Sequence, residues 1–393
     1  MQQIFEAYDA HVLPTYGRFP VAFARGAGCR LYDEAGRAYI DFASGIGVNS
    51  VGHAHPVWVE AVARQAATLT HVSNLYYSEP GGRLAVRLCA LSGLRGVFFA
   101  NSGAEANEGA IKVARKYSHD RYGPDRSVVV TLSGSFHGRT VTTLAATGQE
   151  IFHRHFGPFP AGFRHVPPDD FEALAAQPDD VCAVLLEPVQ GEGGVWPLDG
   201  AYVRRVAALC RERDWLLLCD EVQTGIGRTG DWFAFQSLGV EPDVVTFAKG
   251  IAGGLPFGGF LAGARAADTL GPGDHATTFG GTPLCCAAAL ATLDILAPVL
   301  PGIKAKGAAL RRSIAEMGLP RVTGTRGAGL MIGVALTPGE TPRDWAERLL
   351  RAGLVVLTAG QDALRLLPPL VIGDDDIAAG LSIFENVLGG AAE

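Results

Sequence analysis

Short apolar runs alternate with amphipathic segments along most of this chain, and that alternation limits its fold more than any other feature. Six runs have the length and composition of buried strands, and helical periodicity occurs between several of them. Strands that alternate with helices are typical of a mostly parallel sheet flanked by helices. We therefore predict an α/β fold. The predicted strands are residues 96–100, 127–132, 181–186, 215–219, 244–248 and 260–262, and the predicted helices include 56–69, 105–117 and 202–213.

The pattern differs at the two ends of the chain. Near the N-terminus, residues 29–32 and 38–42 alternate around the turn Asp33-Glu34-Ala35-Gly36, which predicts a hairpin. Beyond residue 284, helices and strands follow one another in a way typical of a small α+β unit. The predicted elements there are an Ala-rich helix, a helix at 304–317, strands near 329–336, 354–358 and 363–367, and a final helix capped by Asp374–Asp376.

The length of the chain sets its domain organisation. With 393 residues, of which 48% are hydrophobic, it can bury a large core and form two or three domains. We predict an N-terminal segment at 1–55, a large α/β domain at 56–284 and a C-terminal segment at 285–393. The two terminal segments together are expected to build the smaller α+β domain.

Charge and cysteine content exclude several classes of protein. The net charge of −7 is spread along the chain without basic blocks, which argues against nucleic acid or an anionic membrane surface as a partner. No apolar stretch is long enough to cross a bilayer, and the N-terminus lacks the pattern of a secretory signal. The seven cysteines are scattered and form no CxxC pair. Reduced thiols in a cytoplasmic protein are therefore expected.

Two predicted strands stop abruptly on a charged residue. The run 215–219 stops on Asp220, and the run 244–248 stops on Lys249. In open α/β sheets the carboxyl ends of parallel strands form the edge where ligands bind. Pyridoxal phosphate needs a Lys that bonds to its aldehyde and an Asp that pairs with its pyridinium nitrogen. Taken singly, each residue has a simpler interpretation, because an Asp there caps a turn and a Lys there often reaches to solvent.

Two further strand ends offer groups that the same cofactor would need. After residues 96–100 comes a turn at Ser102 and then a helix, whose free N–H groups suit a phosphate, although an ordinary helix cap explains the turn equally well. After residues 127–132, Phe136 is suited to stack on a pyridine ring and Arg139 to bind a carboxylate. The alternative is a core Phe beside a solvated Arg.

A fifth strand end carries two carboxylates. Glu187 and Glu192 flank the turn after residues 181–186. A carboxylate pair also occurs in glycosidases, but the sequence does not fix the separation of these two groups. Five strand ends in chain order, each with a different group, favour one shared site over five unrelated turns.

These residues lie in motifs that resemble the class III aminotransferases of fold type I. The resemblance covers almost the full chain, and within that class it is strongest to the acetylornithine aminotransferases. That closer likeness lies at 16–23, 45–49, 52–56 and 73–80. The class motifs are Ser102-Gly103-Ala104-Glu105-Ala106-Asn107, Phe136-His137-Gly138-Arg139-Thr140, Glu187-Pro188-Val189-Gln190-Gly191-Glu192-Gly193-Gly194, Asp220-Glu221-Val222-Gln223-Thr224-Gly225, Ala248-Lys249-Gly250 and Thr278-Phe279-Gly280-Gly281.

The resemblance implies pyridoxal phosphate as the cofactor and a role for each residue that would hold it. Lys249 would bond to the aldehyde and move the proton, Asp220 would pair with the ring nitrogen, and Gln223 would bond near the phenolic oxygen. Phe136 would stack on the ring, and Glu187 would lie beneath the substrate. Ser102, Gly103 and Ala104 would bind the phosphate, together with Thr278 from a neighbouring subunit, so a homodimer with shared sites is expected.

The resemblance also implies how two substrates share one site. Arg139 would bind the carboxylate of the amino donor, with Thr277 and Tyr16 in the substrate region. Arg365 lies in an apolar run and needs a partner charge. By the resemblance, Glu192 neutralises Arg365 while the donor reacts, then moves aside so that Arg365 binds the α-carboxylate of 2-oxoglutarate.

The expected reaction is transfer of the terminal amino group of N2-acetyl-L-ornithine to 2-oxoglutarate in arginine biosynthesis. Ile46 lies where ornithine aminotransferases tend to have a Tyr that binds a free α-amine, and it favours an acylated donor. Succinylornithine, ornithine, 4-aminobutyrate and a carrier-bound lysine precursor remain alternative donors. A dinucleotide-dependent oxidoreductase and a non-catalytic binding protein are alternatives of other classes. No metal is expected, because the pair His53-x-His55 precedes Pro56 at a predicted helix start.

Overall fold

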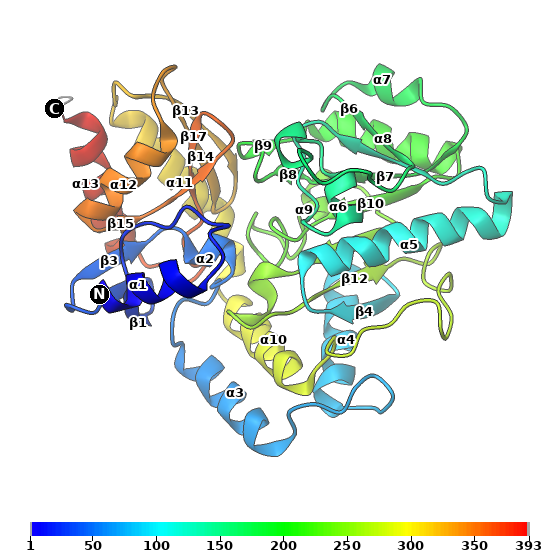
Figure 1. Cartoon of the computed structure of the whole chain (residues 1–393), viewed down its shortest axis with the longest axis horizontal. Coiled ribbons are helices and arrows are strands. Elements are labelled where there is room, and N and C mark those ends of the chain that lie inside the picture. The colour runs from blue at the N-terminus through cyan, green and yellow to red at the C-terminus, as the bar shows by residue number, and fades with distance from the viewer. Residues whose placement is uncertain (1, 391–393) are drawn as a thin grey trace.

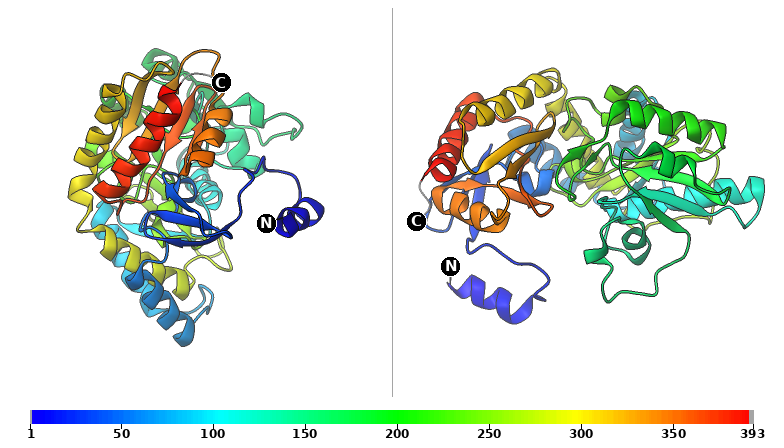
Figure 2. Two further views of the ribbon diagram at one scale, coloured as in Figure 1. Left: turned by 90° about the vertical axis from the view of Figure 1, so that its left-hand side faces the viewer. Right: turned by 90° about the horizontal axis from the view of Figure 1, so that it is seen from above.

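The structure is a computed structural model that describes residues 2–390 and forms two lobes (Figure 1). The middle of the chain forms the larger lobe, and segments from both ends form the smaller one. The views in Figure 2 show that α1 (Gln2–His11) stands apart from the rest of the chain. The boundaries at residues 55 and 284 remain predictions, although the arrangement of the two lobes follows the expected order.

A seven-stranded sheet in the order β4-β12-β11-β10-β7-β5-β6 forms the centre of the larger lobe. Only β12 runs antiparallel to its neighbours, so the prediction of a mostly parallel sheet is confirmed. The carboxyl ends of the other six strands therefore meet at one edge. The strands are β4 (Gly96–Ala100), β5 (Val128–Leu132), β6 (Phe163–Val166), β7 (Val181–Leu186), β10 (Leu216–Asp220), β11 (Val244–Phe247) and β12 (Gly258–Ala262).

Apolar side chains on both faces of this sheet bury it under helices. Every residue of β5, β7, β10 and β11 is buried, as expected for central strands covered on both sides. The helix α5 packs on one face through Ala110, Ile111 and Ala114. The helices of this lobe are α3 (Pro56–Thr68), α4 (Glu79–Ser92), α5 (Gly103–Tyr122), α6 (Val141–Ala146), α7 (Phe171–Ala175), α8 (Gly200–Glu212) and α9 (Ala234–Leu238).

Two small sheets form the other lobe and join the two ends of the chain. In the first, β3 (Ala38–Asp41) pairs in parallel with β15 (Leu354–Val355), next to the predicted hairpin of β2 (Arg30–Asp33) and β3. The outer strand is β1 (Phe23–Ala27). The second sheet has the order β13-β14-β17-β16, with β13 (Val322–Ala328), β14 (Met331–Leu336), β16 (Leu357–Ala359) and β17 (Ala363–Leu366).

Helices cover the outside of the smaller lobe. They are α11 (Ile303–Glu316), α12 (Pro342–Ala352) and α13 (Asp374–Gly389), with the short turn α2 (Ser44–Gly47) near the junction of the lobes. In contrast, α10 (Pro283–Leu296) packs against α3 and α4 of the larger lobe. Within residues 2–390 no single helix is long and apolar enough to cross a membrane, although the bent pair Pro283–Leu296 and Leu300–Glu316 passes by length and composition.

Some elements differ from the sequence prediction. β6 was not predicted, because Arg164 and His165 break the apolar pattern of this edge strand. β13 was not predicted either, because it is rich in Gly and only partly buried. The predicted cap of the last helix is wrong in detail, since Gly373 is the N-cap and the three aspartates occupy the first turn. There they complement the positive end of the helix dipole.

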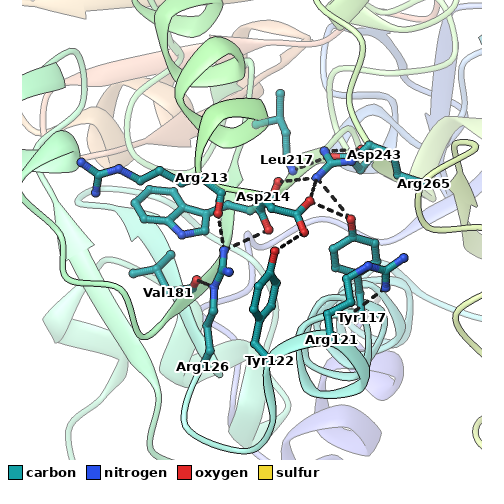
Figure 3. A network of polar contacts seen from close by, with 11 residues as sticks. Tyr117, Arg121, Tyr122, Arg126, Val181, Arg213, Asp214, Leu217, Asp243 and Arg265 are labelled. Carbon is teal, nitrogen blue, oxygen red and sulfur yellow. Dashed lines mark hydrogen bonds and ion pairs between the residues drawn. The ribbon is translucent and has the colours of Figure 1, made fainter.

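A polar network holds the amino ends of β10 and β11, opposite the edge where the strands end (Figure 3). Asp243 is 8% exposed, and its carboxylate accepts both a hydrogen bond of 2.8 Å from the Leu217 amide and two from Arg265 at 2.9 and 3.0 Å. Arg265 also donates to Asp214, which accepts the hydroxyl groups of Tyr117 and Tyr122. This network fixes the starts of the two strands whose ends carry Asp220 and Lys249.

Replacing Asp243 with Ala should lower the free energy of unfolding by about 2–4 kcal/mol, because it leaves a buried amide and an arginine without their acceptor. Urea unfolding followed by circular dichroism measures the change. Asp268→Ala is the control, since its pair with Arg95 is exposed and should contribute less than about 1 kcal/mol. Equal changes in the two variants would contradict the role assigned to the network.

Candidate active site

A cavity of about 410 Å³ opens at the carboxyl edge of the large sheet. It lies between the ends of the strands and the loops that follow them. Most of the predicted site residues line it, although they are spread over about 150 positions of the sequence. The predicted residues in its wall are Ser102, Gly103, Ala104, Phe136, Arg139, Glu187, Asp220, Gln223 and Lys249.

The pairing of β10 with β11 brings the two charged strand ends together. These strands are parallel and in a register that places Asp220 opposite Thr246. Thr246 Oγ1 donates to Asp220 Oδ1 at 3.4 Å. Lys249 follows three positions later, where a short 3-10 helix begins, and its backbone φ of 42° turns the chain sharply at the edge. The sequence prediction that both residues reach one site agrees with this geometry.

Two side chains hold the Asp220 carboxylate in place. Asn107 Nδ2 donates to Asp220 Oδ2 at 2.7 Å, and His137 Nδ1 lies 2.8 Å from the same oxygen. The Val222 amide donates to the other oxygen at 3.0 Å. Asp220 is only 4% exposed, so these contacts compensate for the loss of water around its charge. Asn107 and His137 lie within two of the class motifs, but the sequence did not predict their contact with Asp220.

Burial controls the charge of Lys249. It lowers the pKa of the Lys249 amine below its usual value, and Arg365 acts in the same direction, whereas Glu192 and Asp220 oppose the shift. A larger fraction of neutral amine is the form that attacks a carbonyl carbon. The structure therefore places a nucleophilic amine beside an anchored carboxylate.

Glu187 lies deeper in the cavity wall. Its carboxylate accepts hydrogen bonds from the Phe136 amide at 2.9 Å and from the Gly191 amide at 3.1 Å. Burial raises the pKa of the Glu187 carboxyl to about 7, and the nearby Asp220 contributes in the same direction. Glu187 thus links the loop that carries Phe136 to the loop that carries Glu192.

The first turn of α5 lines the cavity with backbone amides that suit an anion. Ser102 Oγ accepts the Glu105 amide at 3.2 Å, and Glu105 Oε2 accepts the Asn101 amide at 2.6 Å. This arrangement leaves the amides of Gly103 and Ala104 without an acceptor inside the helix, as in every first helical turn. A Cβ on Gly103 would lie 2.7 Å from Val222, so only glycine allows the helix to approach this closely.

An aromatic and a cationic group lie at the cavity mouth. Phe136 is partly buried and packs edge-on against Phe152, with ring centroids 5.8 Å apart. Arg139 is exposed, and its guanidinium lies 4.1 Å from the Phe152 ring and 5.4 Å from the Phe136 ring. The aromatic contacts orient Arg139 without neutralising it, so its charge remains available to a carboxylate.

Glu192 and Arg365 form an ion pair adjoining the cavity. Two hydrogen bonds of 2.6 and 3.2 Å join them, and Arg365 also donates to Gln223 Oε1 at 3.1 Å. Arg365 is 3% exposed. Burial alone would raise the pKa of the Glu192 carboxyl, but Arg365 more than offsets this and lowers it below its usual value. The Glu192 carboxylate is therefore held in its ionised form, and the Gln223 side chain that bonds to Arg365 lines the cavity.

Besides Glu192 and Arg365, three further predicted residues lie outside the cavity wall. Thr277 Oγ1 accepts a hydrogen bond of 3.1 Å from Asn101 at the edge of the site. Thr278 is exposed on the same loop, and Tyr16 is 74% exposed beside Arg18. Their assigned functions remain predictions.

The residues in the cavity fit pyridoxal phosphate. Asn107 Oδ1 and His137 Nε2 are buried without a partner among residues 2–390. The anchored carboxylate, the amine, the aromatic ring and the free amides of α5 are the groups that this cofactor requires. In the described part of the chain no three His, Cys, Asp or Glu side chains gather as metal ligands, and His53 of the His pair instead contacts Asp41 at 2.7 Å.

Known proteins resemble the whole chain. The model of the class-III aminotransferase family matches residues 12–388. The acetylornithine aminotransferase of Haemophilus ducreyi is 52% identical over 98% of both chains. The solved ornithine aminotransferase of Toxoplasma gondii, reported with partial occupancy of pyridoxal phosphate, superposes with a TM-score of 0.94 at 31% identity over 99% of this chain and 94% of that one.

A second solved structure gives the same result. The N-acetylornithine aminotransferase of Stenotrophomonas maltophilia superposes with a TM-score of 0.84 at 37% identity, over 97% of this chain and 98% of that one. The predicted fold type is therefore confirmed. With the family model matching nearly every residue and the strand ends gathered in one cavity, this chain belongs to the class III aminotransferases.

Proposed function

We propose that this enzyme uses pyridoxal phosphate to transfer the terminal amino group of N2-acetyl-L-ornithine to 2-oxoglutarate, a step of arginine biosynthesis. The observation that carries the proposal is the Glu192–Arg365 pair beside Gln223, because it lets one cavity present two different charges. The relatives named as acetylornithine aminotransferases support this donor.

Each residue of the cavity would have a defined part in this reaction. When bound, pyridoxal phosphate supplies an aldehyde that carries the amino group and a protonated ring that withdraws electrons from the reacting carbon. Asp220 would hold the proton on the ring nitrogen, and Phe136 would cover one face of the ring. The amides of Gly103 and Ala104 would bind the phosphate at the positive end of the α5 dipole. Lys249 Nζ would accept the proton from the substrate carbon and return it.

The ion pair would select between the two substrates. The donor would bind with its carboxylate at Arg139, at the cavity mouth, and with its terminal amine inside. While Glu192 neutralises Arg365, no free cation would repel that amine. 2-Oxoglutarate has a carboxylate at each end. When the Glu192 side chain rotates away, Arg365 binds the α-carboxylate and Arg139 binds the other one.

The donor preference rests on Ile46. Ile46 is 43% exposed, two positions before Val48 in the cavity wall. Its aliphatic side chain has no hydrogen-bonding group for a free α-amine, which agrees with an acylated nitrogen. Succinylornithine, ornithine, 4-aminobutyrate and a carrier-bound lysine precursor are the competing donors, because all present a terminal amine.

A donor panel tests the proposal. With 2-oxoglutarate as acceptor, kcat/KM should be highest for N2-acetyl-L-ornithine, by about ten-fold or more over ornithine and 4-aminobutyrate. The reason is that a polar group of the substrate left without a hydrogen-bond partner in the site costs about 1.4 kcal/mol or more. Glutamate formation is measured, and Lys249→Ala is the inactive control. A higher kcat/KM for ornithine or 4-aminobutyrate would contradict the proposed donor.

Replacing Glu192 with Ala tests the proposed selection. Because Arg365 then stays cationic, kcat/KM for the acetylated donor should fall about ten-fold or more, whereas the reaction with 2-oxoglutarate should be unchanged or faster. Single-turnover measurements of each half-reaction give the two values separately. Glu241→Ala is the control, because its pair with Arg211 is exposed. An unchanged ratio of the half-reactions would rule out the selection by Glu192.

We also propose that the enzyme is a homodimer whose subunits complete each other's sites. The support is an apolar surface with no partner among residues 2–390. α3 has no buried residue, and α1 stands apart. Thr278, on the loop beside this surface, would reach the phosphate in the neighbouring subunit. The exposed side chains near it are Leu69, Leu75, Tyr76, Tyr77 and Phe279.

Mixing two defective variants tests this shared site. Lys249→Ala should be inactive, and Thr278→Val should bind the cofactor more weakly. If subunits are mixed after unfolding and refolding, half of the dimers should contain one intact site, with Lys249 from one chain and Thr278 from the other. Activity above that of either variant alone is expected. No recovery, with dimers present by light scattering, would contradict the proposal.

The remaining sequence predictions stay part of this proposal. We propose domain boundaries near residues 55 and 284, which the pairing of β3 with β15 supports. A cytoplasmic location is proposed on the basis of seven cysteines that are all free thiols.

A further inference from the structure

Two arginines lie in one row across the second small sheet. On the central strand β14, Gly333 pairs with Arg326 of β13 on one side and with Arg365 of β17 on the other. Residues directly opposite each other in antiparallel strands project from the same face. Arg326 and Arg365 therefore project from the same face, separated by a residue without a side chain.

The loop that carries Glu192 fills the space above Gly333. This loop, residues 191–195, joins β8 (Val189–Gln190) to β9 (Trp196–Pro197), and β9 lies at the side of the larger lobe that faces β13 (Figure 1). A Cβ on Gly333 would lie 2.9 Å from Val195 Cβ and 3.2 Å from the Gly194 carbonyl oxygen. The missing side chain thus lets the loop settle between the two arginines.

Arg326 holds the backbone of this loop. Its Nε donates to the Gly194 carbonyl at 2.6 Å, and its two terminal nitrogens donate to the Asp362 carboxylate at 2.9 and 3.2 Å. The guanidinium also lies 3.8 Å from the ring of Trp196, at the end of the loop. Arg326 is 11% exposed, so the contact with the neutral carbonyl is largely shielded from water.

The loop is held at a second point, the carbonyl of Glu192 itself. The Gly360 amide donates to the Glu192 carbonyl at 2.9 Å. Gly360 and Asp362 belong to the turn that leads into β17, which carries Arg365. The same short segment of the smaller lobe therefore fixes the loop backbone and supplies the partner of the Glu192 carboxylate.

We propose that Arg326 is a positioning residue that fixes the loop backbone at Gly194, so that substrate exchange moves only the Glu192 side chain. This inference rests on the proposed function. With the carbonyls of Glu192 and Gly194 both held, the carboxylate returns to Arg365 by rotation about its own bonds. If the backbone were released, more conformational freedom would be lost each time the pair formed. The pair would then be open more often and would neutralise Arg365 less well.

The test compares Arg326→Lys and Arg326→Gln with Arg321→Lys. Arg321 is a matched control, because it also donates to backbone carbonyls, of Leu388 and Gly390, and lies near a tryptophan ring, but remote from Glu192. In Arg326→Gln, kcat/KM for the acetylated donor should fall about five-fold or more relative to that for 2-oxoglutarate. Lysine keeps the charge but cannot bond both Gly194 and Asp362. In Arg326→Lys the ratio of the two kcat/KM values should therefore lie between those of Arg326→Gln and wild type.

Hydrogen–deuterium exchange provides a readout that does not depend on turnover. In the purified wild-type protein, peptides that cover residues 188–198 and 355–362 should exchange slowly. In both Arg326 variants they should exchange about ten-fold faster, while the rest of the chain is unchanged. Arg321→Lys should leave these peptides and the ratio of half-reactions as in wild type.

The outcomes separate this inference from the proposed function. If both half-reactions of the Arg326 variants change equally, or their exchange at 188–198 matches wild type, Arg326 has only a general structural role and the inference is wrong. If wild type transaminates no donor of the panel, the proposed function fails. Faster exchange in the Arg326 variants would then still establish that Arg326 fixes the loop.

Discussion

Parallel pairing of β10 with β11 is the constraint on which the site depends. Because the two strands run in the same direction and in fixed register, the residues that end them emerge side by side. Asp220 is the last residue of one strand, and Lys249 begins the turn after the other. The polar network around Asp243 holds the amino ends of both strands. The strand pairing itself sets the register towards their carboxyl ends.

Buried charges give this edge its chemistry. Asn107 and His137 contact the Asp220 carboxylate, and Glu192 pairs with Arg365. Lys249 lies among all of these groups, and burial shifts its amine towards the neutral form. In an environment of low dielectric, small movements of one charged side chain change the binding of the others. Under the proposed function, a single rotation at Glu192 would be enough to change which substrate the cavity accepts.

The sequence predicted the parts of the fold whose pattern is local. β4 and β7 were predicted with the bounds that the structure has, because a polar turn follows each apolar run directly. β6 and β13 were missed because an edge strand with Arg and His, and a strand rich in Gly, lack that contrast. Periodicity reports only on the side chains of one segment. It cannot reveal a strand that forms because a neighbouring strand pairs with it.

The site residues also fall into two groups: those that a local sequence pattern reveals, and those that only the folded chain brings together. Asp220 and Lys249 could be found because each ends an apolar run. The contacts of Asn107 and His137 with Asp220 join three separate segments, so spacing within the sequence does not reveal them. The family resemblance indicated that Glu192 and Arg365 meet, across 173 positions. The contact of Arg326 with Gly194 depends on Gly333, a residue noticeable only for the side chain that it lacks.

The two arginines proposed to bind substrate differ in their access to solvent, so ionic strength should affect them differently. Arg139 is exposed at the mouth, whereas Arg365 is 3% exposed. Dissolved ions screen an exposed charge within a Debye length of about 8 Å at physiological salt, but they hardly reach a buried one. In a concentrated salt solution the outer arginine therefore loses much of its attraction for carboxylates. The inner one retains its hold on whichever anion occupies it, from the protein or from solution.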